Sequence, residues 1–167
     1  MIPWFDRVGT PLAPPETDAL HALLLSDPLL AGARLVAVTN WAEASGAARA
    51  MDVDAEWWDH EEAERERLWL LASHRVGEAE LIRQLTAVTD GVAAGARTKV
   101  GAAAARAGIA DPVAIGDATA AVLLAAHHNA LAELAGEDWG HGFARKYALF
   151  AGGRWPLGYH HGRYLIF

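Results

Sequence analysis

Two adjacent histidines, His127 and His128, interrupt the stretch LLAAHHNALAEL, which is otherwise rich in alanine and leucine. On a helix, neighbouring side chains point about 100° apart, so the two imidazoles are not expected to share one ligand. The surrounding leucines define an apolar face on which His127 falls near the centre and His128 near the edge. Because a polar group that faces a core needs a partner, His127 is the first candidate for chemistry.

An earlier stretch carries a carboxylate and a guanidinium one helical turn apart, Glu61 and Arg65. Both fall on the same apolar helix face as three tryptophans, Trp57, Trp58 and Trp69. Burying two opposite charges is unfavourable unless they pair or meet another polar group. Because large rigid aromatic side chains either fill a core or line a pocket, we expect these tryptophans to wall a pocket between helices.

Counting back from the turns between the expected helices places Glu61 at the same depth as His127, with Arg65 and Thr89 about one turn away. A carboxylate beside an imidazole orients its tautomer and raises its pKa, which suits proton transfer near neutral pH. We therefore expect Glu61 and His127 to be a catalytic acid/base pair. Arg65 would hold an anionic group of the substrate, and Thr89, His128 and the tryptophans would line the site. The predicted activity is cofactor-independent proton transfer, of the isomerase or lyase type, on a small anionic molecule.

Three other interpretations of these residues stay open. The polar cluster could be a satisfied structural network, with Glu61 paired to Arg65. A metal ion could use the histidines and carboxylates, although neither HExxH nor paired Glu-x-x-His is present. Finally, His141, Arg145 and Lys146 could form an anion site at the start of a short helix.

A non-catalytic function is the main alternative. The run DVDAEWWDHEEAERE, from Asp52 to Glu66, is the densest acidic segment of the chain. In an immunity or accessory subunit, such a segment would bind a basic protein partner, with Trp57 and Trp58 as interface anchors.

Composition excludes several classes of protein. The net charge of −7 argues against a nucleic-acid partner, because phosphate binding needs a basic face. The chain has no cysteine, which excludes a disulfide scaffold and thiol catalysis. No apolar run has the length of a membrane span and no signal peptide is evident, so we expect a soluble cytoplasmic protein without a membrane partner. Association of two copies stays open.

The elements that must position these residues are mainly helices in a single domain of residues 1–167. The pattern predicts a bundle of three long antiparallel helices, at about 55–75, 78–107 and 111–135, joined by short connections. A short amphipathic helix follows near Phe143–Phe150, and residues 154–167 should form a β-hairpin. Residues 1–15 read as an irregular proline-rich segment, and ARLVAVTNW as a short strand or a buried extended segment.

Overall fold

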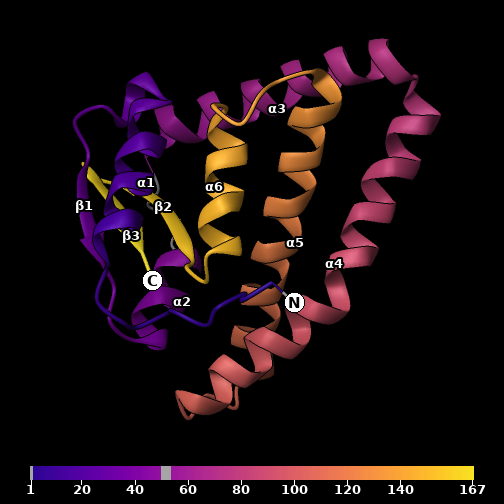
Figure 1. Ribbon diagram of the computed structural model, residues 1–167. Helices are drawn as coiled ribbons and strands as arrows, with labels where there is room; N and C mark the ends of the chain where they lie inside the picture. The colour runs from indigo at the N-terminus through magenta and orange to yellow at the C-terminus, as the bar shows by residue number, and fades with distance from the viewer. Residues whose placement is uncertain (1, 50–53) are drawn as a thin grey trace.

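The computed structural model describes residues 2–49 and 54–167 and is mainly helical (Figure 1). The elements in chain order are α1 (Pro14–Leu25), the 3-10 turn η1 (Pro28–Leu30), β1 (Arg34–Ala37), α2 (Trp41–Arg49), α3 (Ala55–Val76), α4 (Glu78–Arg106), α5 (Pro112–Ala135), α6 (Gly142–Ala151), β2 (Pro156–His160) and β3 (Arg163–Ile166). The predicted fold class, a mostly α bundle with a short C-terminal helix and a small C-terminal hairpin, is confirmed.

The three long helices begin and end where local chemistry requires. The Asp54 carboxylate accepts a hydrogen bond from a backbone N–H of the first turn of α3, and Asp111 does the same for α5. Such caps satisfy N–H groups that have no partner inside the helix. Gly136 ends α5 with a φ of +94°, a left-handed conformation that other residues adopt at a cost.

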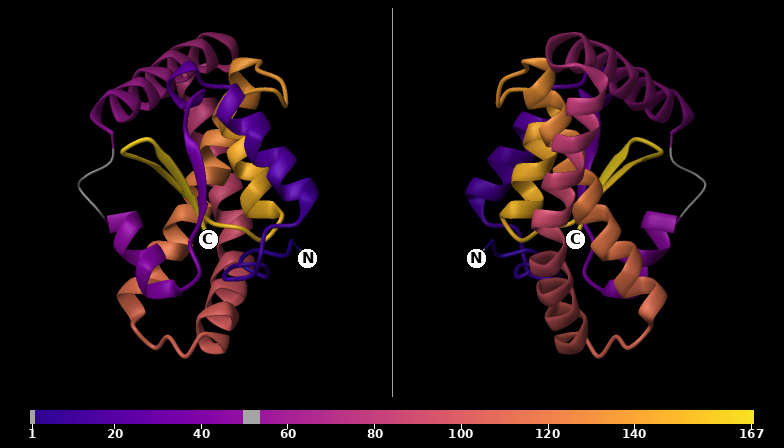
Figure 2. Two further views of the ribbon diagram at one scale, coloured as in Figure 1. Left: turned by 90° about the vertical axis from the view of Figure 1, so that its left-hand side faces the viewer. Right: turned by 90° about the vertical axis from the view of Figure 1, so that its right-hand side faces the viewer.

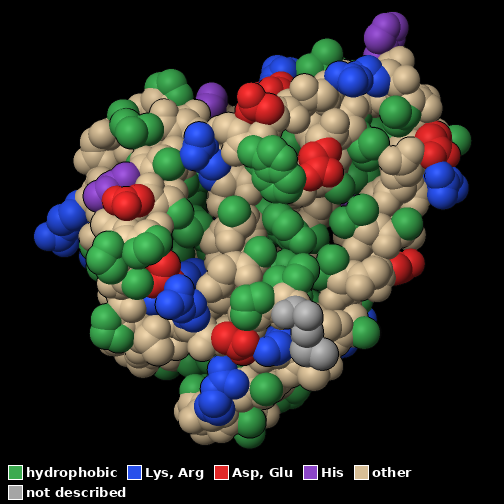
Figure 3. Space-filling view, in the orientation of Figure 1, with side chains coloured by type: hydrophobic (Ala, Val, Ile, Leu, Met, Phe, Trp, Pro, Cys, Tyr) green, Lys and Arg blue, Asp and Glu red, His purple; other side chains and the backbone are tan. Residues whose placement is uncertain are grey.

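The long helices pack on one another in two directions. α4 and α5 lie side by side and antiparallel, α6 packs on the other side of α5, and α3 lies across the ends of these helices at the top of Figure 1. On the face shown in Figure 3, hydrophobic side chains gather over α5 and the facing side of α4. None of the helices in the described ranges is long and apolar enough to cross a bilayer.

The C-terminal hairpin belongs to a larger sheet. Its three strands have the order β1-β3-β2, with β1 parallel to β3 and β2 antiparallel to it. The side views in Figure 2 show this hairpin and α2 on the side of the bundle away from the N-terminus. ARLVAVTNW thus supplies the strand β1, one of the two conformations expected for it.

One buried arginine fastens the N-terminal segment to the hairpin. Arg154 is only 2% exposed and binds both carboxylate oxygens of Glu16, at 2.8 and 3.0 Å. Its remaining donors reach the backbone carbonyls of Arg7, Thr10 and Pro11 at 2.6–2.7 Å. The irregular N-terminal segment is therefore held by hydrogen bonds to one side chain, and Trp155 directly after it is fixed in the core.

Candidate functional site

The histidine pair lies on α5, and the structure reverses the expected placement of its two members. His128 is 7% exposed, whereas His127 is half-buried. The prediction that His127 faces the core and His128 its edge is therefore wrong. The prediction used leucines to mark the core face of α5. The helix packs on its neighbours largely through alanines, however, and Leu124 is 54% exposed.

His128 is a buried imidazole with unused hydrogen-bonding groups. Its ring stacks on that of Phe143, with centroids 4.8 Å apart and planes inclined by 27°. Its ring nitrogens are not among the buried atoms that lack a hydrogen-bond partner, and the residue lines two open spaces. Burial, followed by the charges of Lys146, Arg65 and the neighbouring histidine, lowers the pKa of His128 to about 3. The ring is therefore neutral near pH 7 and offers one N–H donor and one acceptor nitrogen.

The two cations whose charges act on this ring also flank one carboxylate. Glu61 on α3 is 3.5 Å from Nη1 of Arg65 through one oxygen and 3.5 Å from Nζ of Lys146 through the other. Lys146 Nζ also lies 5.7 Å from the ring centroid of Trp57. Both cations lower the pKa of His128, and no carboxylate is among the causes of its shift.

The expected acid/base pair is not in direct contact in this structure. No hydrogen bond or ion pair joins Glu61 to His127 within the described residues, and Glu61 is held by cations instead. Burial lowers the pKa of His127, so its neutral form dominates near pH 7. Thr89 lies near the same end of the site, where its hydroxyl donates to backbone carbonyls of its own helix. A catalytic role of Glu61 and His127 stays a prediction.

The three tryptophans expected to wall one pocket lie in three different environments. Trp57 is buried in the cluster that α1 and the hairpin share, whereas Trp58 is 46% exposed and has the guanidinium of Arg65 5.2 Å above its ring. Trp69 is half-buried and lines a hollow together with Arg65. Trp57 and Trp58 thus form neither a joint pocket wall nor a joint exposed anchor.

The acidic segment expected to bind a basic partner is partly neutralised within its own helix. Asp52 lies outside the described residues. Glu62 and Glu64 form ion pairs with arginines one turn further along α3. The side chain of Glu64 also bonds to His141 at 2.8 Å.

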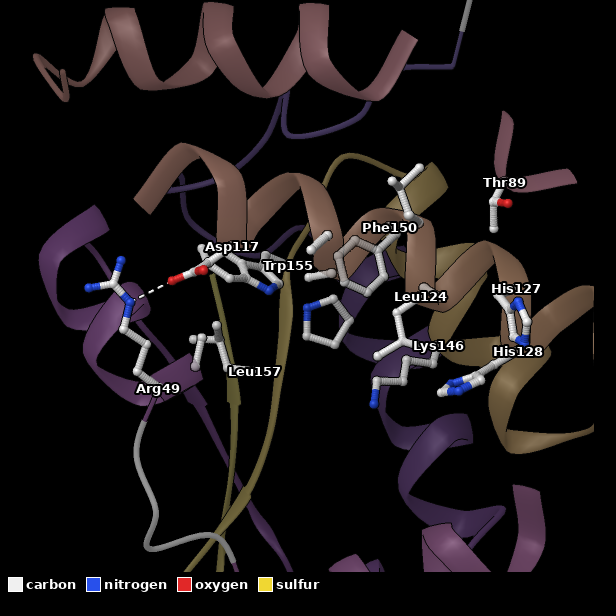
Figure 4. Close-up of a pocket in the computed structure, with 16 residues that line it drawn as sticks. Arg49, Thr89, Asp117, Leu124, His127, His128, Lys146, Phe150, Trp155 and Leu157 are labelled. Carbon is white, nitrogen blue, oxygen red and sulfur yellow. Dashed lines mark hydrogen bonds and ion pairs between the residues drawn. The ribbon is translucent and has the colours of Figure 1, made fainter. Parts of the chain in front are cut away.

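An open groove of about 760 Å³ runs between α5 on one side and α2, α6 and β2 on the other (Figure 4). The main apolar side chains that line it are Ala121, Leu124, Phe150, Trp155, Pro156 and Leu157. At one end Arg49 and Asp117 form an ion pair at 2.5 Å. At the other end lie His127, His128 and Lys146, so polar groups occupy both ends and apolar groups the middle.

A second hollow, of about 630 Å³, adjoins the polar end of this groove. The two histidines line both spaces, and the second hollow adds charged side chains from α3, among them Arg65 and Glu62. The histidine pair therefore stands between an apolar groove and a polar hollow. No group of three or more His, Asp or Glu side chains placed to hold a metal ion occurs in residues 2–49 and 54–167.

Of the three residues considered for an anion site at the start of α6, one reaches the groove. His141 caps the helix by accepting from the N–H of Phe143 at 3.1 Å, and its other nitrogen contacts Glu64. Arg145 donates to a backbone carbonyl of the preceding turn. Lys146, in contrast, lies at the groove.

Sequence reasoning about α3, α4 and α5 missed the contribution of the C-terminal region to the site. Lys146, Phe150, Trp155 and Leu157 all line the groove. The signal for them was the close spacing of aromatic, basic and glycine residues in FARKYALFAGGRWPLGYHHGRYLIF. Nothing in that spacing shows which of these side chains turn toward α5, because it depends on how the hairpin folds back.

No protein-family model matches the chain, no curated protein matches it, and no solved structure matches it. Its function is therefore argued from the geometry and chemistry of the groove.

Proposed function

We propose that the protein binds a small anionic molecule in the groove beside α5, with Lys146 and His128 holding the anionic group. The observation that carries this proposal is His128 itself: the residue is more than nine-tenths buried, it lines the groove together with Lys146, and the charge of Lys146 acts on it. Its ring nitrogens are not among the buried side-chain atoms that lack a partner, so they are accessible and can bond to a ligand in the groove.

The charge at this end of the groove favours an anion. The charges of Lys146 and Arg65 both act on His128 and disfavour its protonated form. A neutral imidazole in such a field donates its N–H to a negatively charged oxygen, while the lysine supplies the charge. Glu61 pairs with Lys146 at 3.5 Å and so positions the ammonium group.

The remainder of the groove suits the apolar part of a ligand. A volume of about 760 Å³ lies in the range of small-molecule sites, which are mostly apolar with a few polar groups that fix orientation. The wall residues Phe150, Trp155 and Leu157 are buried in the fold. They belong to packed elements and need no rearrangement to accept a ligand.

Proton transfer on the bound molecule is a further part of the proposal. His127 borders both the groove and the polar hollow, and burial keeps its ring in the neutral form that accepts a proton near pH 7. In this arrangement Glu61 acts through Lys146, and His127 is the group placed to accept the proton.

The test is a binding titration followed by amide NMR, with a panel of carboxylates and phosphates that differ in their apolar part. We expect shifts confined to α5, α6 and β2, and binding about tenfold to a hundredfold weaker in Lys146→Gln, which is the loss of one charge-assisted hydrogen bond. Lys99→Gln is the matched control, because Lys99 is also partly buried and paired with a carboxylate, Asp6, at 2.7 Å. Absence of binding by every anion, or equal binding by Lys146→Gln, refutes the proposal.

A further inference from the structure

The groove follows a single stripe of α5. Its lining residues on this helix include Asp117, Ala120, Ala121, Leu124, Ala125 and His128. Their spacing of three, four, seven, eight and eleven residues places them on one face of the helix. At 1.5 Å per residue this stripe is about 16 Å long, so the groove is elongated along the helix axis.

The middle of the stripe is apolar and is left open by the fold. Three of its members are alanines, whose small side chains leave room for a chain to lie close to the helix. Leu124 is 54% exposed and belongs to none of the core clusters of buried and packed side chains. Together with the alanines, Leu124 gives the middle of the groove an apolar floor that a ligand can cover.

The two ends of the groove differ in charge. At the His128 end, Lys146 offers an ammonium group and the imidazole one further donor, and both can bond to carboxylate oxygens. At the opposite end, Arg49 and Asp117 neutralise each other in their ion pair. One end therefore attracts an anion, and the other limits how far an apolar chain can extend.

We infer that the ligand is an elongated monocarboxylate with an unbranched aliphatic tail, its carboxylate on Lys146 and His128 and its tail along α5 toward the Arg49–Asp117 pair. This inference rests on the proposed function and adds the class of the ligand. It follows from the length of the stripe, the alanine floor, the open Leu124 and the single cationic end.

The test is calorimetric titration of the full chain with straight-chain monocarboxylates from butyrate to dodecanoate, kept below their micellar concentrations. We expect each added methylene to tighten binding about fourfold, which corresponds to the ~0.8 kcal/mol gained on burying one CH₂. The gain should stop once the tail reaches the Arg49–Asp117 pair. Lys146→Gln should weaken every chain length by the same factor.

A variant near the Arg49–Asp117 end of the groove tests the contribution of the aliphatic tail separately from that of the carboxylate. Ala120 is exposed and lines the groove about 12 Å from His128 along the helix. Ala120→Trp should remove the gain of the longest acids over butyrate, by tenfold or more, when both are measured in the same variant. Ala87→Trp, at an exposed position of α4 outside the groove, is the matched control and should keep the whole series.

The outcomes distinguish this inference from the proposed function. If benzoate and butyrate bind with dependence on Lys146 but longer tails add nothing, the aliphatic ligand is excluded while the anion site stands. Tighter binding of alkyl phosphates than of carboxylates at every length overturns the carboxylate assignment alone. If no anion binds at all, both fail.

Discussion

Protonation of His128 should destabilise the protein as the pH falls. The ring has a pKa of about 3 in the folded protein because it is buried and close to Lys146 and Arg65. In the unfolded chain its pKa is about 6.5. The folded state thus disfavours the charged ring, and its full stability is present above pH 6.5 and is lost as the pH falls toward the folded pKa.

The size of this effect follows from the two pKa values. Between pH 7 and pH 5 the unfolded chain takes up the proton almost completely, whereas the folded protein leaves His128 neutral. Linkage then gives a loss of about 2 kcal/mol in the free energy of unfolding over this interval. His128→Gln removes the titrating group, so its stability should fall by about 2 kcal/mol less than that of the wild type over the same interval.

Urea unfolding at pH 7 and pH 5, followed by circular dichroism, measures this difference directly. The comparison uses the change between two pH values, so any loss of packing on Phe143 affects both measurements and cancels. His74→Gln, on the exposed side of α3, is the control and should keep the pH dependence of the wild type. Equal pH dependence of His128→Gln and wild type, or an NMR titration of His128 near pH 6.5, would falsify the assignment of a neutral buried ring.

Two further predictions concern contacts that hold β2 and α6, the elements beside α5 that line the groove. Arg154→Met leaves the Glu16 carboxylate with only the partly exposed Arg7 as a cationic partner, and should lower the free energy of unfolding by about 3–5 kcal/mol in urea at pH 7, whereas Arg7→Met should lower it by about 1 kcal/mol or less. His141→Ala removes the N-cap of α6 and should cost about 1 kcal/mol in thermal unfolding, while His141→Asn, which retains a capping acceptor, should keep most of the stability.

The helix boundaries could be predicted from the sequence because they depend on local chemistry. Asp54 and Asp111 stand just before α3 and α5 and cap them, and Gly136 ends α5, so residue types that favour helix ends mark these boundaries in the sequence. These signals need no knowledge of the tertiary structure, since a capping oxygen satisfies N–H groups within its own turn.

The faces of the helices were harder to predict. Leucines were used to mark the core face of α5, yet the fold buries alanines there and exposes Leu124 to the groove. Alanine carries little periodic signal by itself, so the rotation of an alanine-rich helix is set by its neighbours. An error in this rotation assigned the core position to His127 and the boundary position to His128. Because the two residues are adjacent, their side chains point about 100° apart, and a modest rotation reverses the assignment.

The partners of Glu61 show the limit of depth counting. That count brought Glu61 and Arg65 to the level of the histidines, and Arg65 does act on His128. The count leaves out Lys146, because the sequence does not show that α6 packs beside α5. The nearest positive partner of a carboxylate can come from any element that packs on it, and here Lys146 shares Glu61 with Arg65.

The wall of the groove is held by contacts within the protein, and this affects which property of a ligand should determine its affinity. Arg154 anchors the chain just before Trp155, and Trp155 exchanges two backbone hydrogen bonds with Phe167, at 2.7 and 2.9 Å. The wall that follows is therefore rigid, while Glu61 already holds Lys146 at the other end. Because little ordering remains to be done on binding, affinity should follow the apolar area that the ligand buries along α5. Under the proposed function, chain length is accordingly the most direct test of the ligand class inferred for this groove.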